Sequence, residues 1–363
     1  DVIMTKNATN FITPITFETL TGNKCIVDTF DRNFQFNVEH VSLAKLADIF
    51  LVAPASADVI GKIANGIADD MLTTTIMACK CPKLISPAMN TNMFTNPIVQ
   101  DNLKKLEHYG YEIIQPDSGY LACGDTGAGK MPSEQVLLNY ILRTIAKDKD
   151  MAGIKLTVTA GPTREKLDPV RFLSNNSTGK MGYAIAKMAM LRGADVTLIS
   201  GKVSLEPVPF VKMVDIVSAE DMYNAVIKSA KDADIIIKAA AVADYRPSDV
   251  SDEKIKKKDG DMSIPLERTK DIIGTLGSSK RDGLFLCGFS METEHMLDNS
   301  KVKLTKKNLD MIVANNVKVA GAGFGTDTNV VTVITKDAVE ELPMMSKEEV
   351  ADALLDRIMK ARQ

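Results

Sequence analysis

Short apolar runs alternate with helical patterns along almost the whole chain. In the first half, these runs predict strands at residues 2–4, 24–27, 49–53, 83–85 and 112–114, and helical spacing predicts helices near residues 14–20, 56–66, 96–109 and 133–146. Strands that alternate with helices are typical of a parallel sheet whose strands are joined by crossover helices. The pattern therefore predicts the α/β class.

The second half repeats the alternation. Apolar runs predict strands at residues 155–159, 196–200, 235–239, 284–288, 311–314 and 330–335, and a closing helix begins at Ser346. A helix from about Lys180 places Met181, Ile185 and Met188 on one face, because residues spaced by three and four positions share a face. Residues 155–200 therefore form a strand–helix–strand unit.

Residues 146–153 (AKDKDMAG) separate the two patterns. The segment is charged and ends in glycine. We expect one domain over residues 1–148 and a second over residues 149–363, since a chain of 363 residues exceeds what one core usually supports. Residues 1–4 already resemble a buried strand, so we expect a strand–helix unit of roughly 30 residues to precede them in a longer sequence.

Composition excludes several classes of function. The chain has 44 basic and 47 acidic side chains and a net charge of −3, which gives no electrostatic case for binding nucleic acid. No apolar run reaches the roughly 18 residues that would span a membrane. Five scattered cysteines argue against disulfides and for a reducing cytoplasm. No histidine or cysteine pair completes a zinc site with Cys79 and Cys81.

Three segments of the first half carry polar groups after predicted strands, where open α/β sheets bind ligands. Residues 53–72 (APASADVIGKIANGIADDML) begin with small side chains, and Ser56 can cap a helix or simply allow tight packing. Residues 87–90 (PAMN) end in an amide that can bind a carboxylate or a carbonyl. Residues 122–131 (ACGDTGAGKM) can fold over a site as a lid that carries Cys123.

Residues 124–130 also fit the start of a phosphate loop, but Met131 follows where such a loop needs serine or threonine. No buried strand leads into the segment, so we reject that interpretation. His40 lies at the expected start of a helix, in the sequence EHVSL. It is either a surface histidine or the best general base available near neutral pH.

Taken in order, FITP, EHVSL, APASADVIGKIANGIAD, PAMN and ACGDTGAGKM resemble the flavin-containing cysteine decarboxylases, specifically phosphopantothenoylcysteine decarboxylase. The resemblance implies a flavodoxin-like, three-layered domain with FMN as the cofactor. It implies that His40 is the catalytic base, that Asn90 binds the substrate carboxylate, that Met93 also binds substrate, and that Cys123 returns a proton. The implied FMN positions are Phe11, Ser56, Ala57, Asp58 and Ala88.

The chemistry that this family performs is physically reasonable. Loss of carbon dioxide from a cysteinyl carboxylate needs an acceptor for the electrons left on carbon, and oxidation of the thiol by a flavin creates one. The family's glycine-rich first loop is expected before residue 1 and is not in this sequence.

In the second half, TAGPTRE follows a strand directly, and SNNSTGKMG runs into a helix. Amides at a helix N-terminus bind phosphate or carboxylate, although an ordinary capped turn fits the spacing equally well. AAAVADY ends another strand. The lysine-rich residues 251–261 are either a solvated loop or a flap that closes on polyphosphate. Lys303 and Lys307 are four positions apart on an expected helix and can face one site.

With TKDII, CGFSMET and KKNLD, these segments resemble phosphopantothenate–cysteine ligase, and the bacterial bifunctional enzyme has the two domains in this order. The resemblance implies a Rossmann-like, three-layered domain with a mostly parallel sheet. It implies CTP with Mg²⁺, phosphopantothenate and cysteine as ligands, and an acyl cytidylate made or used with the help of Asn175. The implied substrate and CTP positions are Ala239, Ala240, Asp244, Lys254, Lys270, Asp271, Ile272, Ile273, Phe289, Lys303 and Lys307.

Three hypotheses stay open. The chain is a bifunctional enzyme of coenzyme A synthesis, a working ligase joined to a disabled decarboxylase, or a non-catalytic flavoprotein scaffold. Retention of His40, Asn90 and Cys123 argues against the scaffold, because binding alone needs none of them. The resemblance also implies homo-oligomers, with trimers of the first domain and dimers of the second.

Overall fold

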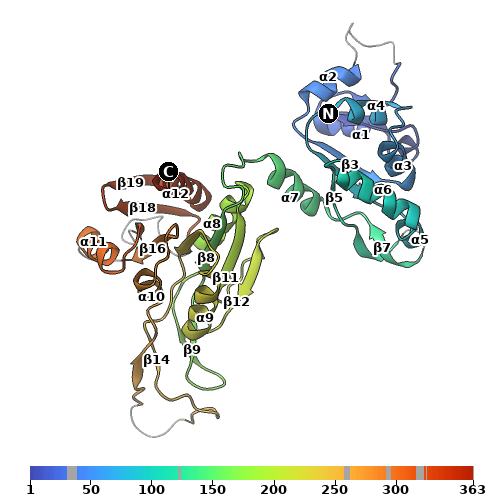
Figure 1. Cartoon of the computed structure of the whole chain (residues 1–363). Coiled ribbons are helices and arrows are strands. Elements are labelled where there is room, and N and C mark those ends of the chain that lie inside the picture. The colour runs from blue at the N-terminus through green and yellow to red at the C-terminus, as the bar shows by residue number, and fades with distance from the viewer. Residues whose placement is uncertain are drawn as a thin grey trace. The chain divides into compact units, whose positions relative to one another are not determined.

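The computed structural model describes residues 1–30, 39–121, 124–256, 262–291, 296–315, 323 and 325–362. The chain divides into two compact units, Asp1–Ala146 and Lys147–Gln363 (Figure 1). Among the described residues, no helix combines the length and apolar character that crossing a membrane requires.

The first unit contains a three-stranded parallel sheet. The elements in chain order are β1 (Val2–Ile3), α1 (Pro14–Thr21), β2 (Cys25–Ile26), α2 (Glu39–Leu46), β3 (Phe50–Ala55), α3 (Ala57–Ala64), α4 (Met71–Ala78), β4 (Lys83–Pro87), α5 (Thr91–Phe94), α6 (Pro97–His108), β5 (Glu112–Ile113), β6 (Asp117–Tyr120), β7 (Thr126–Lys130) and α7 (Glu134–Ile145). The sheet order is β3-β4-β5, β1 and β2 form a separate parallel pair, and β6 and β7 form an antiparallel hairpin.

The central strand β4 is apolar on both faces because helices cover it: Leu84 packs in a cluster with Leu137 of α7, and Ile85 packs in a cluster with α3, α4 and α6. Ile60 of α3, Ile76 of α4, Ile85 of β4 and Leu106 of α6 are almost completely buried in one cluster. Every strand expected in this half is present. The hairpin was expected only as a glycine-rich lid. A phosphate loop runs directly into a helix, whereas here residues 126–130 form a strand of this hairpin and α7 begins only at Glu134, so rejection of that loop is confirmed.

The second unit is built on an eight-stranded sheet. Its elements are β8 (Lys155–Ala160), β9 (Arg164–Lys166), β10 (Phe172–Ser174), α8 (Lys180–Leu191), β11 (Asp195–Ser200), β12 (Lys212–Asp215), α9 (Ala219–Ser229), β13 (Ile235–Lys238), β14 (Tyr245–Pro247), β15 (Leu266–Arg268), α10 (Ile272–Ser278), β16 (Phe285–Met291), α11 (Met296–Lys306), β17 (Met311–Asn315), β18 (Thr328–Thr335), β19 (Val339–Ser346) and α12 (Lys347–Ala361). The order is β12-β11-β8-β13-β16-β17-β18-β19, and β18 alone among these strands runs opposite to the others, because it pairs antiparallel with both β17 and β19.

Helices cover both faces of this sheet, which makes three layers. Ile235 and Ile237 of β13 pack in the cluster that contains the buried residues of α8 and α12, whereas Ile236 packs with α9 and α10. Successive residues of a strand point to opposite faces, so a strand buried on both sides reads as one continuous apolar run. The mostly parallel α/β fold expected from the sequence is confirmed.

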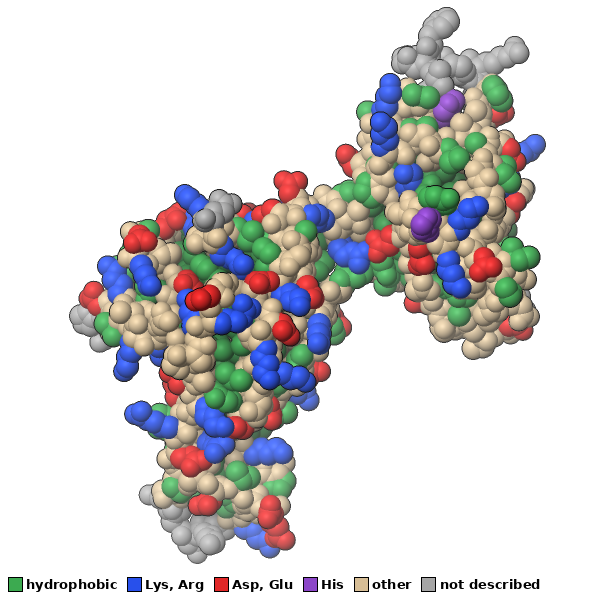
Figure 2. All heavy atoms as spheres, in the orientation of Figure 1, with side chains coloured by type: hydrophobic (Ala, Val, Ile, Leu, Met, Phe, Trp, Pro, Cys, Tyr) green, Lys and Arg blue, Asp and Glu red, His purple; other side chains and the backbone are tan. Residues whose placement is uncertain are grey.

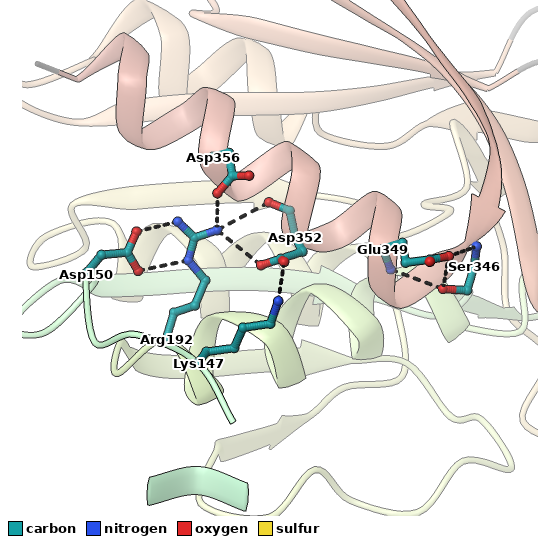
Figure 3. Close-up of polar contacts among 7 residues, drawn as sticks. All are labelled: Lys147, Asp150, Arg192, Ser346, Glu349, Asp352 and Asp356. Carbon is teal, nitrogen blue, oxygen red and sulfur yellow. Dashed lines mark hydrogen bonds and ion pairs between the residues drawn. The ribbon is translucent and has the colours of Figure 1, made fainter. Parts of the chain in front are cut away.

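A buried arginine joins the start of the second unit to its last helix (Figure 3). The guanidinium of Arg192, at the end of α8, pairs with Asp150, with Asp352 at 3.2 Å and with Asp356 at 2.6 Å. The Arg192 side chain is 7% exposed, and the hydrogen bonds that it donates to Asp150 and Asp356 raise its pKa above its ordinary value. Lys147 adds a 2.6 Å ion pair to Asp352.

Candidate active sites

The carboxyl ends of β3 and β4 lie side by side in the first unit. Ala55 pairs with Pro87, and the Ala88 amide donates to the Ala55 carbonyl at 3.0 Å. Directly after β3, Ser56 caps α3 through a 3.3 Å hydrogen bond from the amide three residues on. Ser56, Ala57 and Ala88 therefore meet at one edge of the sheet, where small side chains let a planar ring approach the backbone.

A cavity of about 600 Å³ lies beside this edge, between residues of β1 and of β3. Its lining includes Phe11 and Ser56, together with Leu43 of α2. The volume and the apolar walls suit a ring the size of a flavin. Among the described residues the lining contains no lysine or arginine, so hydroxyl, amide and backbone groups, such as those of Ser56 and Asn7, would have to hold a cofactor phosphate.

Asn90 connects the PAMN loop to the β6–β7 hairpin. Its Oδ1 accepts a 2.8 Å hydrogen bond from the Asn92 amide, which caps α5, and its Nδ2 donates to Asp125 at 3.2 Å. The Met89 amide also donates to the Gly129 carbonyl of β7 at 2.9 Å. The hairpin therefore lies directly against the loop that carries Asn90.

This close packing depends on glycines in β7. Gly129 has a φ of +137°, and a Cβ added there would collide with the Met89 carbonyl oxygen. A Cβ at Gly127 would collide with the Thr91 hydroxyl. The glycine-rich character of the lid thus has a packing cause: two glycines let β7 approach the PAMN loop.

The structure places the other expected residues of the first unit in several different elements. Cys123 lies outside the described residues, but Asp125, two positions on, contacts Asn90. Met93 is an exposed residue of α5. His40 is half-buried near the start of α2, the helix that contributes Leu43 to the cavity. Asp58 is an exposed first-turn residue of α3 and pairs with Lys62 at 3.6 Å.

In the second unit, β8 and β13 are neighbours at the point where the strand order reverses. The chain continues from β8 to β11 and β12 on one side and from β13 to β16 and β17 on the other. Ligands bind in the crevice at the carboxyl ends of such strands. Here the loops after β8 and β13 lie together, because the Ala241 amide donates to the Gly161 carbonyl at 3.0 Å and the Ala243 amide donates to the Thr163 hydroxyl at 3.0 Å.

Asn175 belongs to this group of loops. It follows β10, and its Nδ2 donates to the Ala241 carbonyl at 3.1 Å. Ser174 donates to the Thr163 carbonyl at 2.7 Å, which fixes the strand end from which Asn175 leaves. The Asn175 amide is thereby held beside the small-residue loop of Ala239 and Ala240.

A cleft of about 480 Å³ opens at the same edge. Its lining combines most of the expected nucleotide positions: Asp244, Lys270, Asp271, Ile272, Ile273, Phe289, Lys303 and Lys307. Lys303 comes from α11, and Lys307 continues its last turn, because the Lys307 amide donates to the Lys303 carbonyl at 3.0 Å. The expected approach of these two lysines to one site is therefore present.

Charge pairs organise the cleft. Asp271 caps α10 by accepting a 3.1 Å bond from the Gly274 amide, and it pairs with Lys307 at 2.9 Å. Burial alone would raise the pKa of Asp271, but these two hydrogen bonds, together with the charges of Lys307 and Lys238, outweigh burial and lower it. Lys270 pairs with Glu220 at 2.7 Å and lies 4.8 Å from the centre of the Tyr223 ring. Lysines so placed are suited to anionic ligands.

A smaller hollow of about 100 Å³ adjoins the cleft at the N-terminal end of α8. Ala239 and Ala240 line it, and Phe289 lines both hollows. Gly182 lets α8 approach the end of β8 closely, since a Cβ at this position would lie 2.6 Å from the Ala160 Cβ. Because the large cleft and the small hollow adjoin, they can hold two substrates next to each other.

Lys254 is not among the described residues that line either hollow. It is exposed, at the base of the segment that joins β14 to β15, and residues 257–261 of the expected flap lie outside the described residues. Its neighbour Ile255 is fixed, because the Ile255 amide donates to Asp168 at 3.2 Å and its carbonyl accepts from Arg171 at 2.9 Å.

Comparison with known proteins covers both units. Residues 151–361 match the family described as DNA/pantothenate metabolism flavoprotein C-terminal domain, and residues 1–146 match the family described as Flavoprotein. The coenzyme A biosynthesis bifunctional protein CoaBC of Bacillus subtilis is 46% identical over 361 residues, which is 98% of this chain and 89% of that protein. The chain belongs to the CoaBC family.

Two further similarities qualify this membership. The crystal structure of the C-terminal domain of a CoaBC protein covers 59% of this chain and 97% of its own, with 44% identity and a TM-score of 0.51. A protein from an unknown prokaryotic organism, named cysteine/cysteine sulfinic acid decarboxylase, is 42% identical over 96% of this chain and 99% of its own. CoaBC-like sequences thus include proteins with another named activity.

Reasoning from the sequence missed several cleft residues of this CoaBC-family chain. Lys238, Tyr245, Arg268 and Thr269 line the cleft but were not expected there. The signal for Lys238 was a lysine that ends the run Ile-Ile-Ile immediately before AAAVADY. Tyr245 and Thr269 stand at the ends of the motifs AAAVADY and TKDII, although no role was expected of them, whereas Arg268 gave no signal, because its position depends on the antiparallel pairing of β14 with β15.

Proposed function

We propose that this chain performs two consecutive steps of coenzyme A synthesis. The second unit joins 4′-phosphopantothenate to cysteine at the expense of CTP, and the first unit decarboxylates the product to 4′-phosphopantetheine. One observation carries the proposal: a CoaBC-family chain retains, on each of its two units, a separate cluster of polar side chains at the carboxyl edge of a parallel sheet. We assign the decarboxylase to residues 1–148 and the ligase to residues 149–363.

In the ligase, the carboxylate of phosphopantothenate attacks the α-phosphorus of CTP and expels pyrophosphate. The amine of cysteine then attacks the acyl carbon, and CMP leaves. Lys303 and Lys307 would neutralise the charge that develops on the phosphates, and Asp244 with the amides of Ile272 and Ile273 would orient the nucleotide. Asn175 would donate to the acyl phosphate from its position beside Ala241.

Mg²⁺, bound with CTP, would neutralise phosphate charge, since this ion usually keeps several waters and few protein ligands. Among the described residues, no group of three or more histidine, cysteine, aspartate or glutamate side chains could form a metal cage.

In the decarboxylase, Phe11, Ser56, Ala57, Asp58 and Ala88 would surround FMN, which supplies oxidation of the substrate thiol when bound. Asn90 would hold the substrate carboxylate with Met93 beside it, His40 would accept a proton, and Cys123 would return one. The contact between Asn90 and Asp125 supports this arrangement, because it brings the lid that carries Cys123 to the carboxylate-binding loop.

The test incubates the purified chain with phosphopantothenate, cysteine and CTP and follows pyrophosphate and carbon dioxide separately. We expect both products, with carbon dioxide dependent on CTP. Pyrophosphate without carbon dioxide, even when FMN is added, would support a ligase joined to a disabled decarboxylase. If neither pyrophosphate nor carbon dioxide forms, the result would support the non-catalytic scaffold. Light scattering would test the proposed homo-oligomer of decarboxylase trimers and ligase dimers.

A second candidate follows from the relative named cysteine/cysteine sulfinic acid decarboxylase, which aligns with 96% of this chain. Its activity would need the first unit alone. Supplying free cysteine or cysteine sulfinic acid without CTP distinguishes the two functions. Carbon dioxide released under those conditions would favour the second candidate over coenzyme A synthesis.

A further inference from the structure

Lys238 ends the central strand β13 at the floor of the cleft in the second unit. The strand runs Ile235–Lys238, and its three isoleucines are almost completely buried. The Lys238 side chain is partly buried and lines the cleft together with Lys303 and Lys307. A long charged side chain therefore follows an apolar run at the point where the parallel sheet opens toward ligands.

The ammonium of Lys238 has no hydrogen bond or ion pair to any other residue within the described part of the chain. The charges that act on it come from Lys307 and Lys303, which repel it, and from Asp271 and Asp244, which attract it. Asp271 is already engaged by Lys307 at 2.9 Å and by the Gly274 amide. Burial first, and Lys307 next, lower the pKa of Lys238 to about 8.

Other elements around the cleft supply further charge of the same sign. Arg268 of β15 and Lys270 line it. The lining residues Gly288, Phe289 and Ser290 of β16 and Ile312 of β17 carry no titratable side chain. Positive charge thus exceeds negative charge around Lys238, and an anionic ligand would supply the balance.

A second buried lysine of the same unit shows how a structural lysine is satisfied. Lys347, at the start of α12, is 6% exposed, and its ammonium donates to the Gly323 carbonyl at 3.0 Å and to the Thr326 carbonyl. These bonds hold the loop before β18. Lys238 has no comparable carbonyl partner among the described residues, so a role in holding a loop does not explain it.

We propose that Lys238 binds a phosphate group of the nucleotide in this cleft and takes up a proton when it does so. The inference rests on the proposed ligase function and adds a residue to it. Lys238 is partly buried among like charges and has no hydrogen-bond partner among the described residues, and a polyanion in the cleft would supply that partner and offset the repulsion. Lys238 approaches the cleft from the end of a strand inside the sheet, whereas Lys303 and Lys307 approach from α11 and its last turn, so the anion is held from two sides.

The experiment is calorimetric titration of the full chain with CTP in two buffers of different ionisation enthalpy. With a pKa of about 8, roughly three quarters of the Lys238 amines are neutral at about pH 8.5 and roughly a tenth at about pH 7. We therefore expect the wild-type chain to take up roughly 0.7 proton per CTP at the higher pH and close to 0.1 at the lower one.

Lys238→Met removes the titrating group with little change in volume. We expect it to weaken CTP binding by roughly tenfold or more at about pH 7, to abolish the proton uptake at about pH 8.5, and to leave resistance to denaturant unchanged or higher. Lys212→Met is the matched control. Lys212 is an exposed lysine at the start of β12, and its replacement makes the same charge change in the same unit without altering either quantity.

Lys238→Arg keeps the charge at every pH used, so it should bind CTP without proton uptake. This variant and the wild-type proton count decide the matter if Lys238→Met does not fold. If Lys238→Met binds CTP with wild-type affinity and wild-type proton uptake, the inference about Lys238 is overturned but the proposed ligase function is not. A wild-type chain that binds no CTP would overturn the proposed ligase function and this inference with it.

Discussion

The hairpin β6–β7 offers a sharp test of how the first unit assembles its site. Gly129→Ala places a Cβ against the Met89 carbonyl oxygen, at a φ of +137° that alanine rarely adopts. The hairpin carries Asp125, which contacts Asn90, and the segment with Cys123. We therefore expect the substitution to detach the lid from the PAMN loop and to impair decarboxylation selectively.

The magnitude follows from two losses. A residue with a Cβ at positive φ costs roughly 1–2 kcal/mol. Loss of the 2.9 Å hydrogen bond from the Met89 amide to the Gly129 carbonyl costs about 1 kcal/mol more. A sum of roughly 2–3 kcal/mol lowers the population of the docked hairpin by about 30- to 150-fold when docking is marginal.

Gly119→Ala is the control, because Gly119 lies in the same hairpin and a Cβ there meets nothing within 4 Å. The assay follows carbon dioxide from added phosphopantothenoylcysteine and, in the same preparation, pyrophosphate from the ligase reaction. We expect Gly129→Ala to lose decarboxylation and to keep ligation, and Gly119→Ala to keep both. Decarboxylation by Gly129→Ala within about twofold of the wild type would refute the docking argument.

Three other predictions concern the second unit. Asn175→Asp should stop pyrophosphate release and leave decarboxylation of added phosphopantothenoylcysteine unchanged, because the new carboxylate cannot donate to the Ala241 carbonyl; loss of both activities would contradict the assignment of the two domains. Arg192→Met should lower the free energy of unfolding by roughly 2–4 kcal/mol in denaturant titration, since it removes the cation that Asp150 and Asp356 pair with and leaves Asp352 with Lys147, whereas Lys187→Met, which breaks the exposed pair with Glu348, should cost less than about 1 kcal/mol. Asp168→Asn should increase hydrogen exchange at residues 251–256, because the Asp168 carboxylate accepts from Arg171 and from the Ile255 amide. The Arg171 hydrogen bond lowers the pKa of Asp168, so its contribution to stability is present above the unfolded pKa of about 4 and is lost only as the pH falls further; a difference between Asp168→Asn and wild type that already shrinks between about pH 7 and pH 5 would contradict this cause.

Much of the fold follows from the order of apolar residues. The run Ile235 to Ile237 is apolar at every position because helices cover both faces of the sheet, and such runs mark buried parallel strands directly. Helix starts could also be predicted from the sequence, since Ser56, Ser133 and Ser346 each cap the helix expected to follow them. Local chemistry was enough in these cases.

Elements with weak apolar patterns could not be predicted from the sequence in the same way. The hairpin β6–β7 contains Gly119, Gly127 and Gly129, and glycine-rich segments carry no periodic signal. Its role became visible only from the contacts of Gly129 with Met89. Likewise, Arg192 reads as an ordinary charged residue after a helix, although it joins three aspartates from distant parts of the second unit.

The sequence by itself determined the α/β class, the positions of the main strands and the membership of two successive motif sets in known families. It did so because apolar periodicity and motif spacing are local properties of the chain. Only the tertiary structure decided which side chains share a cavity. It brought Lys238 to Lys303 and Lys307 and left Lys254 outside the described lining of that cleft. Strand order sets these distances, and strand order depends on pairing between segments that lie far apart in the chain.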